Sequence, residues 1–334
     1  MDKSKIFGFI TIMVLAFLIF NGVSHAEEAE HVLRAGLIDP ASHIDTVATE
    51  RVADLVAERT DGAVEIQVYP ASQLGFAPDM MEGMRAGTIE MFVGAVTWLG
   101  AFETDYWLPG VLYVFDDQET SREIHRGPYF QELAETMRED HGIRVLTQDW
   151  DRKARHFAAT ESFTSPEEIQ GMPIRVPEQE SWIKVFELAG TEPSPIALAE
   201  TFTGLQQGII QATEQALNWL YFNNYHEVAE NIVLTHHNYE QTGVFISEVV
   251  YQDLPQEYQE IIEETAKEVT EWRNTMADQE IEYAREQMEA EGANFIEVDV
   301  DEWQDYFRDR LWPELQEEIG YSEDLVEHIM EHWE

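Results

Sequence analysis

The first β-α-β unit of the chain reads HVLRAGLIDPASHIDTVATERVADLVAERTDGAVEIQVY over residues 31–69. The apolar run at 31–38 predicts a strand, and the alternation of apolar and polar residues at 63–69 predicts a second strand. Residues 45–59 between them have the apolar spacing of a helix. Two strands joined by such a helix pair in parallel, so this stretch predicts the α/β class. The predicted apolar face of the helix contains Val47, Val52, Leu55 and Val56.

Strands and helices continue to alternate after this unit. A turn is predicted at 70–75 and a short helix at 78–86. Strands separated by helices favour parallel sheets. The further predicted strands lie at residues 89–96, 143–147, 174–176, 209–213 and 244–250.

The pattern becomes helical after Leu254. Residues 255–291 have helical apolar spacing, and a helix of that length can run from one domain to another. A short strand at 293–298 and helices at 303–319 and 322–333 complete the predicted C-terminal region. A chain of 334 residues favours two domains, and one that crosses between them more than once forms a cleft with a hinge.

The charge of the chain excludes several classes of partner. The sequence has 66 Asp and Glu against 20 Lys and Arg, a formal net charge of -46, and only five of the basic residues are lysines. A nucleic-acid-binding protein needs a basic surface that displaces counterions from phosphates, and binding to an anionic membrane surface also needs basic residues. The composition therefore excludes most proteins of both kinds.

The acidic composition indicates a protein adapted to high salt. The Debye length falls to roughly 3 Å at 1 M salt, where repulsion between surface carboxylates is screened. The chain has no cysteine, which excludes disulfides, a thiol nucleophile and thiolate metal ligands. With 44% apolar and 11% aromatic residues, the chain can bury sizeable cores, and its stability depends on them.

The first 26 residues have the pattern of a cleaved signal peptide. Lys3 and Lys5 precede an apolar stretch at residues 6–20, and Ser24 and Ala26 place small side chains where a signal peptidase reads. The alternative is a membrane anchor, but the stretch is shorter than the roughly 20 residues that a spanning helix needs. We expect cleavage after Ala26 and a periplasmic location.

Three separated regions resemble one known family. GAVEIQVYPASQLG at residues 62–75 is followed by MRAGTIEM at 84–91. Further on come SPEEIQGMPIRVP at 165–177 and LQQGIIQATEQ at 205–215, and Leu-Pro at 254–255 precedes the long helix. In this order the motifs resemble those of the substrate-binding proteins of tripartite ATP-independent periplasmic (TRAP) transporters, of the DctP type.

The resemblance implies an α/β protein with a two-domain periplasmic binding protein fold, in which a cleft closes on a small organic anion. The domains would comprise residues 27–152 with 241–280, and residues 153–240 with 281–334. The implied function is to capture an organic carboxylate and deliver it to the membrane subunits of a TRAP transporter for ion-gradient-driven uptake. The alternative is a ligand-sensing periplasmic subunit of a signalling system.

Enzymatic activity has little support in the sequence. There is no G-x-S-x-G motif, no P-loop and no G-x-G-x-x-G motif, and with no cysteine the chain lacks a recognisable nucleophile constellation. We therefore expect no enzymatic activity and no cofactor or resident metal ion, although metal assistance in ligand binding is left open. A monomer is expected, and a dimer formed through the long helix is left open.

Three candidate ligand contacts are carried over from the family by position. An arginine in the Ile-Arg-Val-Pro motif holds the ligand carboxylate in that family, which implies this role for Arg175. A second arginine 20 residues earlier assists, and Arg155 stands at that position. The third contact is an Asn after a Glu, whereas this sequence has Gln215 after Glu214, a side chain longer by one methylene.

Physical reasoning also supports Arg175. It lies in a short apolar strand at 174–176, near the strand end where α/β folds place ligands, and its guanidinium can form a bidentate pair with a carboxylate. The competing interpretation is a surface arginine paired with one of many acids. For Arg155 the competing interpretation is stronger, because Arg152, Lys153 and Arg155 form a basic cluster that can neutralise nearby carboxylates. The same cluster can reverse the sign of the field inside the cleft.

Aromatic side chains are expected to line the rest of the cleft. The candidates are Trp98 and Phe76 near predicted strand ends and Trp219 in the following helical segment, and each could instead be a core residue. Leu198 and Glu178 stand where sugar-acid binders of the family often carry an aromatic and a neutral polar residue. Their identity favours a smaller or more apolar carboxylate over a polyhydroxylated sugar acid.

Overall fold

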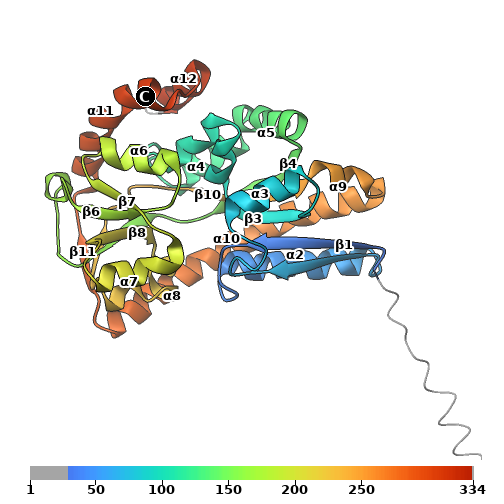
Figure 1. The fold of residues 1–334 in the computed structure, drawn as a ribbon, viewed down its shortest axis with the longest axis horizontal. Coiled ribbons are helices and arrows are strands. Elements are labelled where there is room, and N and C mark those ends of the chain that lie inside the picture. The colour runs from blue at the N-terminus through green and yellow to red at the C-terminus, as the bar shows by residue number, and fades with distance from the viewer. Residues whose placement is uncertain (1–28, 333–334) are drawn as a thin grey trace, which may run out of the picture.

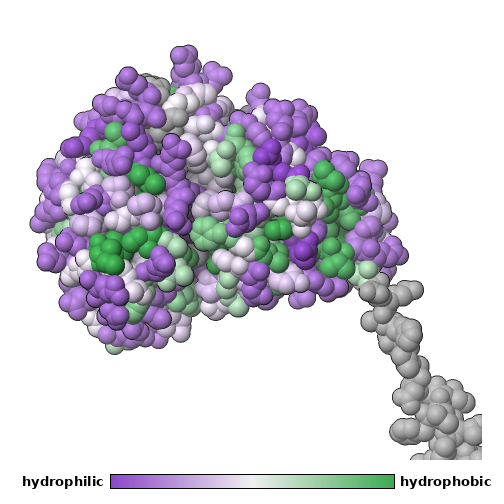
Figure 2. Space-filling model, viewed as in Figure 1, coloured by the Kyte–Doolittle hydropathy of each residue, from purple (hydrophilic) through white to green (hydrophobic). Residues whose placement is uncertain are grey.

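The computed structural model describes residues 29–332, so the predicted signal peptide lies outside the described residues. The chain forms two β-sheets with helices packed around them, which confirms the predicted α/β class (Figure 1). Hydrophilic residues cover most of the face seen in Figure 2, in line with the net charge of -46. Within the described range, no helix combines the length and the apolar character needed to cross a membrane.

The first sheet contains, in spatial order, β2 (Val64–Tyr69), β1 (His31–Leu37), β3 (Met91–Ala95), β10 (Gln241–Ser247) and β4 (Ile143–Asp151). The predicted β-α-β unit forms one edge, where β1 and β2 pair in parallel and α2 (Ile44–Arg59) connects them. β1 also pairs in parallel with β3, whereas β10 runs antiparallel to both β3 and β4.

The second sheet contains, in spatial order, β11 (Asn294–Glu297), β9 (Asn231–Leu234), β5 (Arg155–Ala159), β8 (Ala212–Ala216), β6 (Pro173–Val176) and β7 (Glu192–Pro195). β5 runs antiparallel to β8 and β9, while β6 is parallel to β7 and β8. Both sheets are therefore mixed, and the prediction of parallel sheets was wrong. β5 and β10 each follow a connection from the other sheet, and each runs antiparallel to both of its neighbouring strands.

Helices cover the sheets and extend from them. Local sequence explains some of their ends. α5 (Pro128–His141) begins at a proline, whose fixed φ suits the first helical turn, and it ends at Gly142, which takes a left-handed φ of 69°. The remaining α-helices are α3 (Ala77–Arg85), α4 (Gln118–Arg126), α6 (Glu180–Leu188), α7 (Thr201–Gln206), α8 (Leu217–Phe222), α9 (Glu248–Asp253), α10 (Gln256–Ala290), α11 (Val300–Ile319) and α12 (Glu323–His332).

The buried face of α2 differs slightly from the predicted one. Ala48, Val52 and Val56 are buried at a spacing of four residues and pack in the core of the first sheet. Val47 is 37% exposed, because it lies one position away from that line of side chains. The prediction that Val47 belongs to the apolar face was therefore wrong.

Three segments connect the two sheets. Residues 152–154 lead from β4 to β5, and residues 235–240 lead from β9 to β10. The third connection is α10, a single helix of 35 residues that runs past both sheets (Figure 1). Ala266 in its first half packs in the core of the first sheet, and Met288 in its second half packs in the core beside the second sheet. The predicted long connecting helix is confirmed.

The C-terminal helices contact both parts of the molecule. Trp303 of α11 packs against Phe163, which follows β5, with ring centroids 5.8 Å apart. Tyr129 of α5 lies 2.8 Å from the Ser322 hydroxyl at the start of α12. The predicted helical C-terminal region is confirmed, whereas the assignment of residues 281–334 to one domain stays a prediction.

Two strands are displaced from their predicted positions. The strand predicted at 209–213 is observed as β8 at Ala212–Ala216, and Ile209 is 57% exposed in the turn that follows α7. Gly208 in that turn has a left-handed φ of 70°, so the chain reaches the sheet only after the apolar pair at 209–210. The strand predicted at 244–250 ends at Ser247, where α9 begins.

Candidate functional site

A pocket of about 450 Å³ lies between the two sheets, and we call it the central pocket. The carboxyl ends of β1 and β3 reach it from one side, and those of β6 and β8 reach it from the other. Open α/β sheets bind ligands at such ends. The first-sheet side contributes Ile38, Phe76, Ala95, Thr97 and Trp98; the second-sheet side contributes Arg155, Arg175, Pro177, Gln179, Trp182, Leu198 and Trp219; Arg152 and Glu240 come from the connections.

Arg175 is a buried cation of the central pocket that has no ion pair with any described residue. Its side chain extends from β6 and the residue is only 3% exposed. Nε donates a hydrogen bond to the carbonyl oxygen of Ile196 at 2.9 Å, and Nη1 has no hydrogen-bond partner in the described part of the chain. Burial lowers the pKa of Arg175. A carboxylate placed against this guanidinium would supply the missing charge and acceptors.

Arg155 lines the same pocket but already has two acidic partners. Its Nε and Nη2 donate to the Glu214 carboxylate at 2.5 and 2.7 Å, and Nη1 lies 3.3 Å from Glu240. Burial alone would lower the pKa of Arg155, but the charge of Glu214 outweighs it and raises that pKa. Burial alone would raise the pKa of Glu214, but Arg155 and a hydrogen bond from His237 hold it at about 2. Both groups are therefore ionised at neutral pH.

Arg152 and Glu240 face the pocket from the two short connections. The Arg152 backbone N–H donates to the Glu240 carbonyl oxygen at 3.1 Å, and Nη1 of Arg152 lies 3.5 Å from the Glu240 carboxylate. The Thr97 hydroxyl donates to the same carboxylate. Nε of Arg152 is buried and has no hydrogen-bond partner among residues 29–332.

Aromatic rings line the pocket and stack on its cations. Phe76 and Trp98 meet edge to face with ring centroids 5.9 Å apart. The guanidinium of Arg152 lies 5.3 Å from the Trp219 ring, and that of Arg155 lies 4.7 Å from the Trp182 ring. Such contacts stabilise a guanidinium where few water molecules reach it.

Comparison with known proteins identifies the family. Bacterial extracellular solute-binding protein family 7, named DctP, matches residues 36–318. The chain belongs to the DctP family. It is 25% identical to the 2,3-diketo-L-gulonate-binding periplasmic protein YiaO of Escherichia coli, over 91% of this chain and 92% of that one. It is also 25% identical to the C4-dicarboxylate-binding periplasmic protein DctP of Rhodobacter capsulatus, over 80% and 81% of the two chains.

A solved member of the family has the same fold. The TRAP periplasmic solute-binding protein of Xanthobacter autotrophicus, crystallised with β-D-galacturonate, superposes with a TM-score of 0.82 at 25% identity, covering 90% of this chain and 98% of that chain. This likeness and the two mixed sheets confirm the predicted two-domain periplasmic binding protein fold. The family is one of solute-binding receptors.

The central pocket contains five of the six site residues predicted for this DctP-family chain: Arg175, Arg155, Trp98, Phe76 and Trp219. Gln215 is buried but is not among the lining residues, and its Oε1 has no hydrogen-bond partner within the described chain. Alternation along β8 directs Gln215 and Glu214 to opposite faces of the sheet, and Glu214 is the one that contacts Arg155. A contact between Gln215 and the ligand stays a prediction.

Leu198 and Glu178, the two positions from which a smaller or more apolar ligand is predicted, lie in different cavities. Leu198 lines the central pocket, whereas Glu178 lines an adjoining cavity of about 860 Å³. The two cavities share Thr97, Trp98 and Gln179. Glu178 therefore lies at the outer side of the ligand site.

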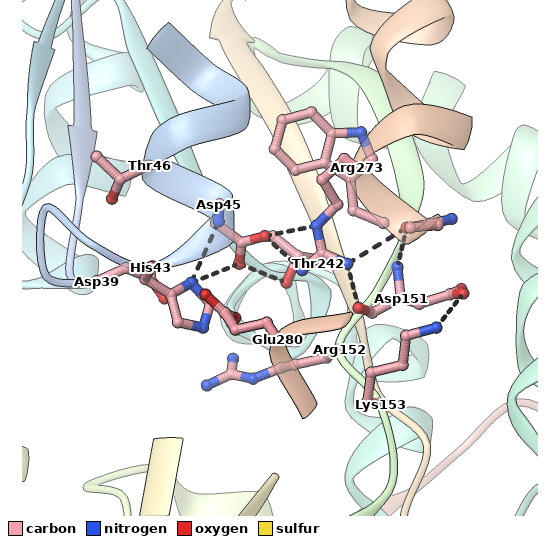
Figure 3. A network of polar contacts seen from close by, with 12 residues as sticks. Asp39, His43, Asp45, Thr46, Asp151, Arg152, Lys153, Thr242, Arg273 and Glu280 are labelled. Carbon is pink, nitrogen blue, oxygen red and sulfur yellow. Dashed lines mark hydrogen bonds and ion pairs between the residues drawn. The ribbon is translucent and has the colours of Figure 1, made fainter. Parts of the chain in front are cut away.

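A buried polar network adjoins the pocket at the junction of the two sheets (Figure 3). Asp45 of α2 accepts hydrogen bonds from Nε and Nη2 of Arg273 of α10 at 2.8 and 2.5 Å. His43, which caps α2, lies 3.1 Å from the side-chain amide of Asn218 on α8, and that amide donates to Glu280 at 2.6 Å. The network thus joins α2, α8 and α10, which belong to different parts of the fold.

Burial controls protonation in this network. Burial raises the pKa of Asp39 to about 7 and that of Glu280 to about 7, and it lowers the pKa of His43 to about 4. Asp39, His43 and Asp45 place possible metal-ligand atoms within 4.8 Å of one another. Because Arg273 already pairs with Asp45, we interpret the group as an ion-pair network and not as a metal site.

Sequence reasoning missed several residues of the pocket. Gln179 and Trp182 follow the Ile-Arg-Val-Pro motif by a few positions, so the motif itself could have drawn attention to them. Glu240 had no such signal, because it reaches the pocket only through the crossing at residues 235–240. Arg152 was visible as part of the basic cluster but was not selected as a ligand contact.

Proposed function

We propose that this protein is the solute-binding subunit of a TRAP transporter, which captures a small organic carboxylate in the central pocket and delivers it to the membrane subunits. The observation that carries the proposal is Arg175, a buried guanidinium that lines the central pocket and whose Nη1 has no partner among the described residues. A ligand carboxylate would accept hydrogen bonds from this group and neutralise it. The names of the relatives, which include sugar-acid and dicarboxylate binders, support an acidic ligand.

Local charge would draw an anion into the pocket in spite of the overall charge. The net charge of -46 repels anions at long range, but three guanidinium groups line the site. The proposed mechanism begins with the ligand carboxylate on Arg175. The two halves then close about the connections at 152–154 and 235–240, so that aromatic side chains cover the ligand. Closure would create the surface that the membrane subunits recognise, in the periplasm.

Sugar acids belong among the candidate ligands. The Xanthobacter structure holds galacturonate, and the Escherichia coli relative is named for a keto-gulonate. In this chain, Oε1 of Gln179 is buried and has no hydrogen-bond partner in the described residues, so it could accept a hydrogen bond from a ligand hydroxyl. We therefore give less weight to Leu198 and Glu178 as signs of an apolar ligand.

Calorimetric titration of the mature protein with mono- and dicarboxylates, keto acids, aromatic acids and sugar acids tests the proposal, at low and at molar salt. Thermal unfolding provides a second readout, because a ligand at 100 times its Kd adds about 2.7 kcal/mol to the free energy of unfolding. We expect Arg175→Ala to weaken the best ligand by about 100-fold or more, since the carboxylate loses its buried partner.

The control for this variant is Arg310→Ala, which removes an exposed arginine of α11 that donates to the Tyr306 hydroxyl. It removes the same charge from the molecule far from the lining residues. Unchanged affinity in Arg175→Ala, or an equal loss in Arg310→Ala, would show that the assigned site is wrong. Binding of neutral solutes alone would contradict the carboxylate assignment.

A further inference from the structure

The two short connections between the sheets each place one charged side chain in the central pocket. Arg152 lies in the connection at 152–154 and Glu240 in the connection at 235–240, with 3.5 Å between Nη1 and the carboxylate. Both side chains are at least nine-tenths buried. Glu240 also lies 3.3 Å from Arg155 and accepts a hydrogen bond from Thr97, so its position is fixed from several sides.

The charges around the pocket leave one positive unit for a ligand. Arg152, Arg155 and Arg175 bring three positive charges, and Glu240 and Glu214 bring two negative ones. Burial lowers the pKa of His237, which lies 3.3 Å from Glu214, and so favours the neutral form of that ring. Without Glu240, the same pocket would hold two net positive charges.

The buried polar network beside the pocket adds no net charge to this balance at pH 6. Asp45 and Arg273 form an ion pair and cancel. Asp39 and Glu280, whose pKa values burial raises to about 7, are mostly protonated at pH 6, and His43, with a pKa of about 4, is neutral there.

The outer side of the site disfavours a second ligand carboxylate. The adjoining cavity shares Thr97, Trp98 and Gln179 with the central pocket, and Glu82, Glu178 and Glu180 line it. A dicarboxylate that placed one end on Arg175 and extended outward would bring its other end toward these three acids. Like charges repel, but water and salt screen these three exposed acids, and Glu82 already pairs with Arg85 at 3.1 Å, so this repulsion only adds to the effect of Glu240.

From these observations we infer that Glu240, paired with Arg152, determines the charge class of the ligand, and that it restricts the pocket to acids with a single carboxylate. The inference rests on the proposed function, since it assumes a carboxylate on Arg175. Arg152 keeps a role in this arrangement, because its unpartnered Nε can donate to a neutral hydroxyl or carbonyl oxygen of the ligand. Glu240 is thus a specificity-determining residue.

The test uses pairs of acids that differ only in a second carboxylate. L-galactonate and galactarate are one pair, and 3-hydroxybutyrate and malate are another. Their Kd values are measured by calorimetry at pH 6 and constant ionic strength for the wild type, Glu240→Gln, Arg152→Gln and the double variant. Glu65→Gln, which removes an exposed acid on β2, is the control for a change in net charge.

In the wild type we expect the monocarboxylate of at least one pair to bind about tenfold tighter or more than its partner. Glu240→Gln is expected to shift that ratio by about tenfold or more toward the dicarboxylate, because the pocket gains a second positive charge. Arg152→Gln weakens the monocarboxylate, and the double variant restores the wild-type preference because its net charge is again one. The double variant also removes both members of the pair if Glu240→Gln alone fails to fold.

Tighter or equal binding of the dicarboxylates by the wild type would overturn the inference while leaving the proposed function intact. The same conclusion follows if Glu240→Gln shifts the ratio no more than Glu65→Gln does. Absence of binding by any acid of the full panel would instead overturn the proposed function, and the inference with it.

Discussion

The second-sheet side of the central pocket contributes two charged residues besides its apolar ones, whereas the first-sheet side contributes none and is mainly apolar. Arg155 and Arg175 belong to the second-sheet side, whereas Ile38, Phe76 and Trp98 form most of the first-sheet side. The charged side can hold an anion before closure, and the apolar side can then exclude water from the ion pair. Excluding water strengthens a charge-assisted contact, so the two sides contribute in sequence to one binding event.

The charged side is itself divided between an arginine that is fully paired and one that is not. Arg155 is held by Glu214 and Glu240, and it belongs to the folded structure whether or not a ligand is present. Within the described chain, Arg175 donates a hydrogen bond to the Ile196 carbonyl oxygen, and its Nη1 has no partner. Arg155 therefore contributes mainly to the fold, and under the proposed function Arg175 is the arginine that binds the ligand carboxylate.

The comparison of Arg155 with Arg175 predicts its largest effect on the free energy of unfolding. Glu214→Ala leaves Arg155 with one of its two acidic partners, and loss of a buried ion-pair partner lowers the free energy of unfolding by about 3–5 kcal/mol. Urea denaturation in the absence of ligand measures the change. Glu65→Ala, which removes an exposed acid of β2, should change it by no more than about 0.5 kcal/mol. A similar small effect for Glu214→Ala would contradict the structural role given to Arg155.

The buried polar network at the junction of the two sheets should give an effect of intermediate size, which is a pH dependence of the free energy of unfolding. Burial raises the pKa of Asp39 to about 7, above its value in the unfolded chain. Between about pH 4 and pH 7 the folded state keeps a proton that the unfolded state has lost, so this group lowers the free energy of unfolding as the pH rises. Asp39→Asn removes the titration and should gain about 2 kcal/mol relative to the wild type between pH 5 and pH 8.

Denaturation of both proteins at pH 5 and pH 8 checks this sign. Glu280 and His43 titrate in both proteins, so the difference reports Asp39 together with the change that its loss causes in the neighbouring Asp45 and His43. The contributions of Glu280 and His43 have opposite signs: burial raises the pKa of Glu280 to about 7 and lowers that of His43 to about 4. A constant difference across the pH range would mean that Asp39 does not hold its proton in the folded state.

Substitution on the apolar first-sheet side of the pocket should give the smallest effect, a modest rise in the Kd of the ligand. Phe76 is half-buried and packs against Trp98, so Phe76→Ala removes apolar contact area from the closed pocket. We expect the Kd of the best ligand to rise by about threefold to tenfold, equivalent to about 1 kcal/mol. The ratio of mutant to wild-type Kd should be the same at low and molar salt, because no charge is lost. A ratio that changes with salt would show that this side acts through electrostatics.

Several parts of the fold could be predicted because their signals are local. The β-α-β unit at residues 31–69 and the helix α10 follow from apolar periodicity. Arg175 could be predicted because a short apolar strand and the motif around it both mark a strand end. The displaced strand β8 shows the limit of this reasoning, since the apolar pair at 209–210 precedes the sheet and the strand itself contains Thr, Glu and Gln.

The ion pairs of the pocket and of the neighbouring network, which sequence reasoning missed, depend on contacts between distant segments. Arg155 and Glu240 are 85 positions apart, and Asp45 and Arg273 are 228 positions apart. No periodicity or spacing along the chain links such pairs. They meet because the chain crosses between the sheets at 152–154 and 235–240 and again along α10. Local sequence patterns therefore could not predict the ion pairs of the pocket.

The position of β10 also has a consequence for the order in which the chain folds. β10 lies between β3 and β4 in the first sheet, yet it is formed by residues 241–247, long after both neighbours. Without that segment, β3 and β4 have no strand between them, and the N-terminal half of the chain cannot complete its own sheet. Pairings over such separations form slowly because a long loop must first be closed. The first sheet is therefore complete only when the first 247 of the 334 residues, almost three-quarters of the chain, take part in folding.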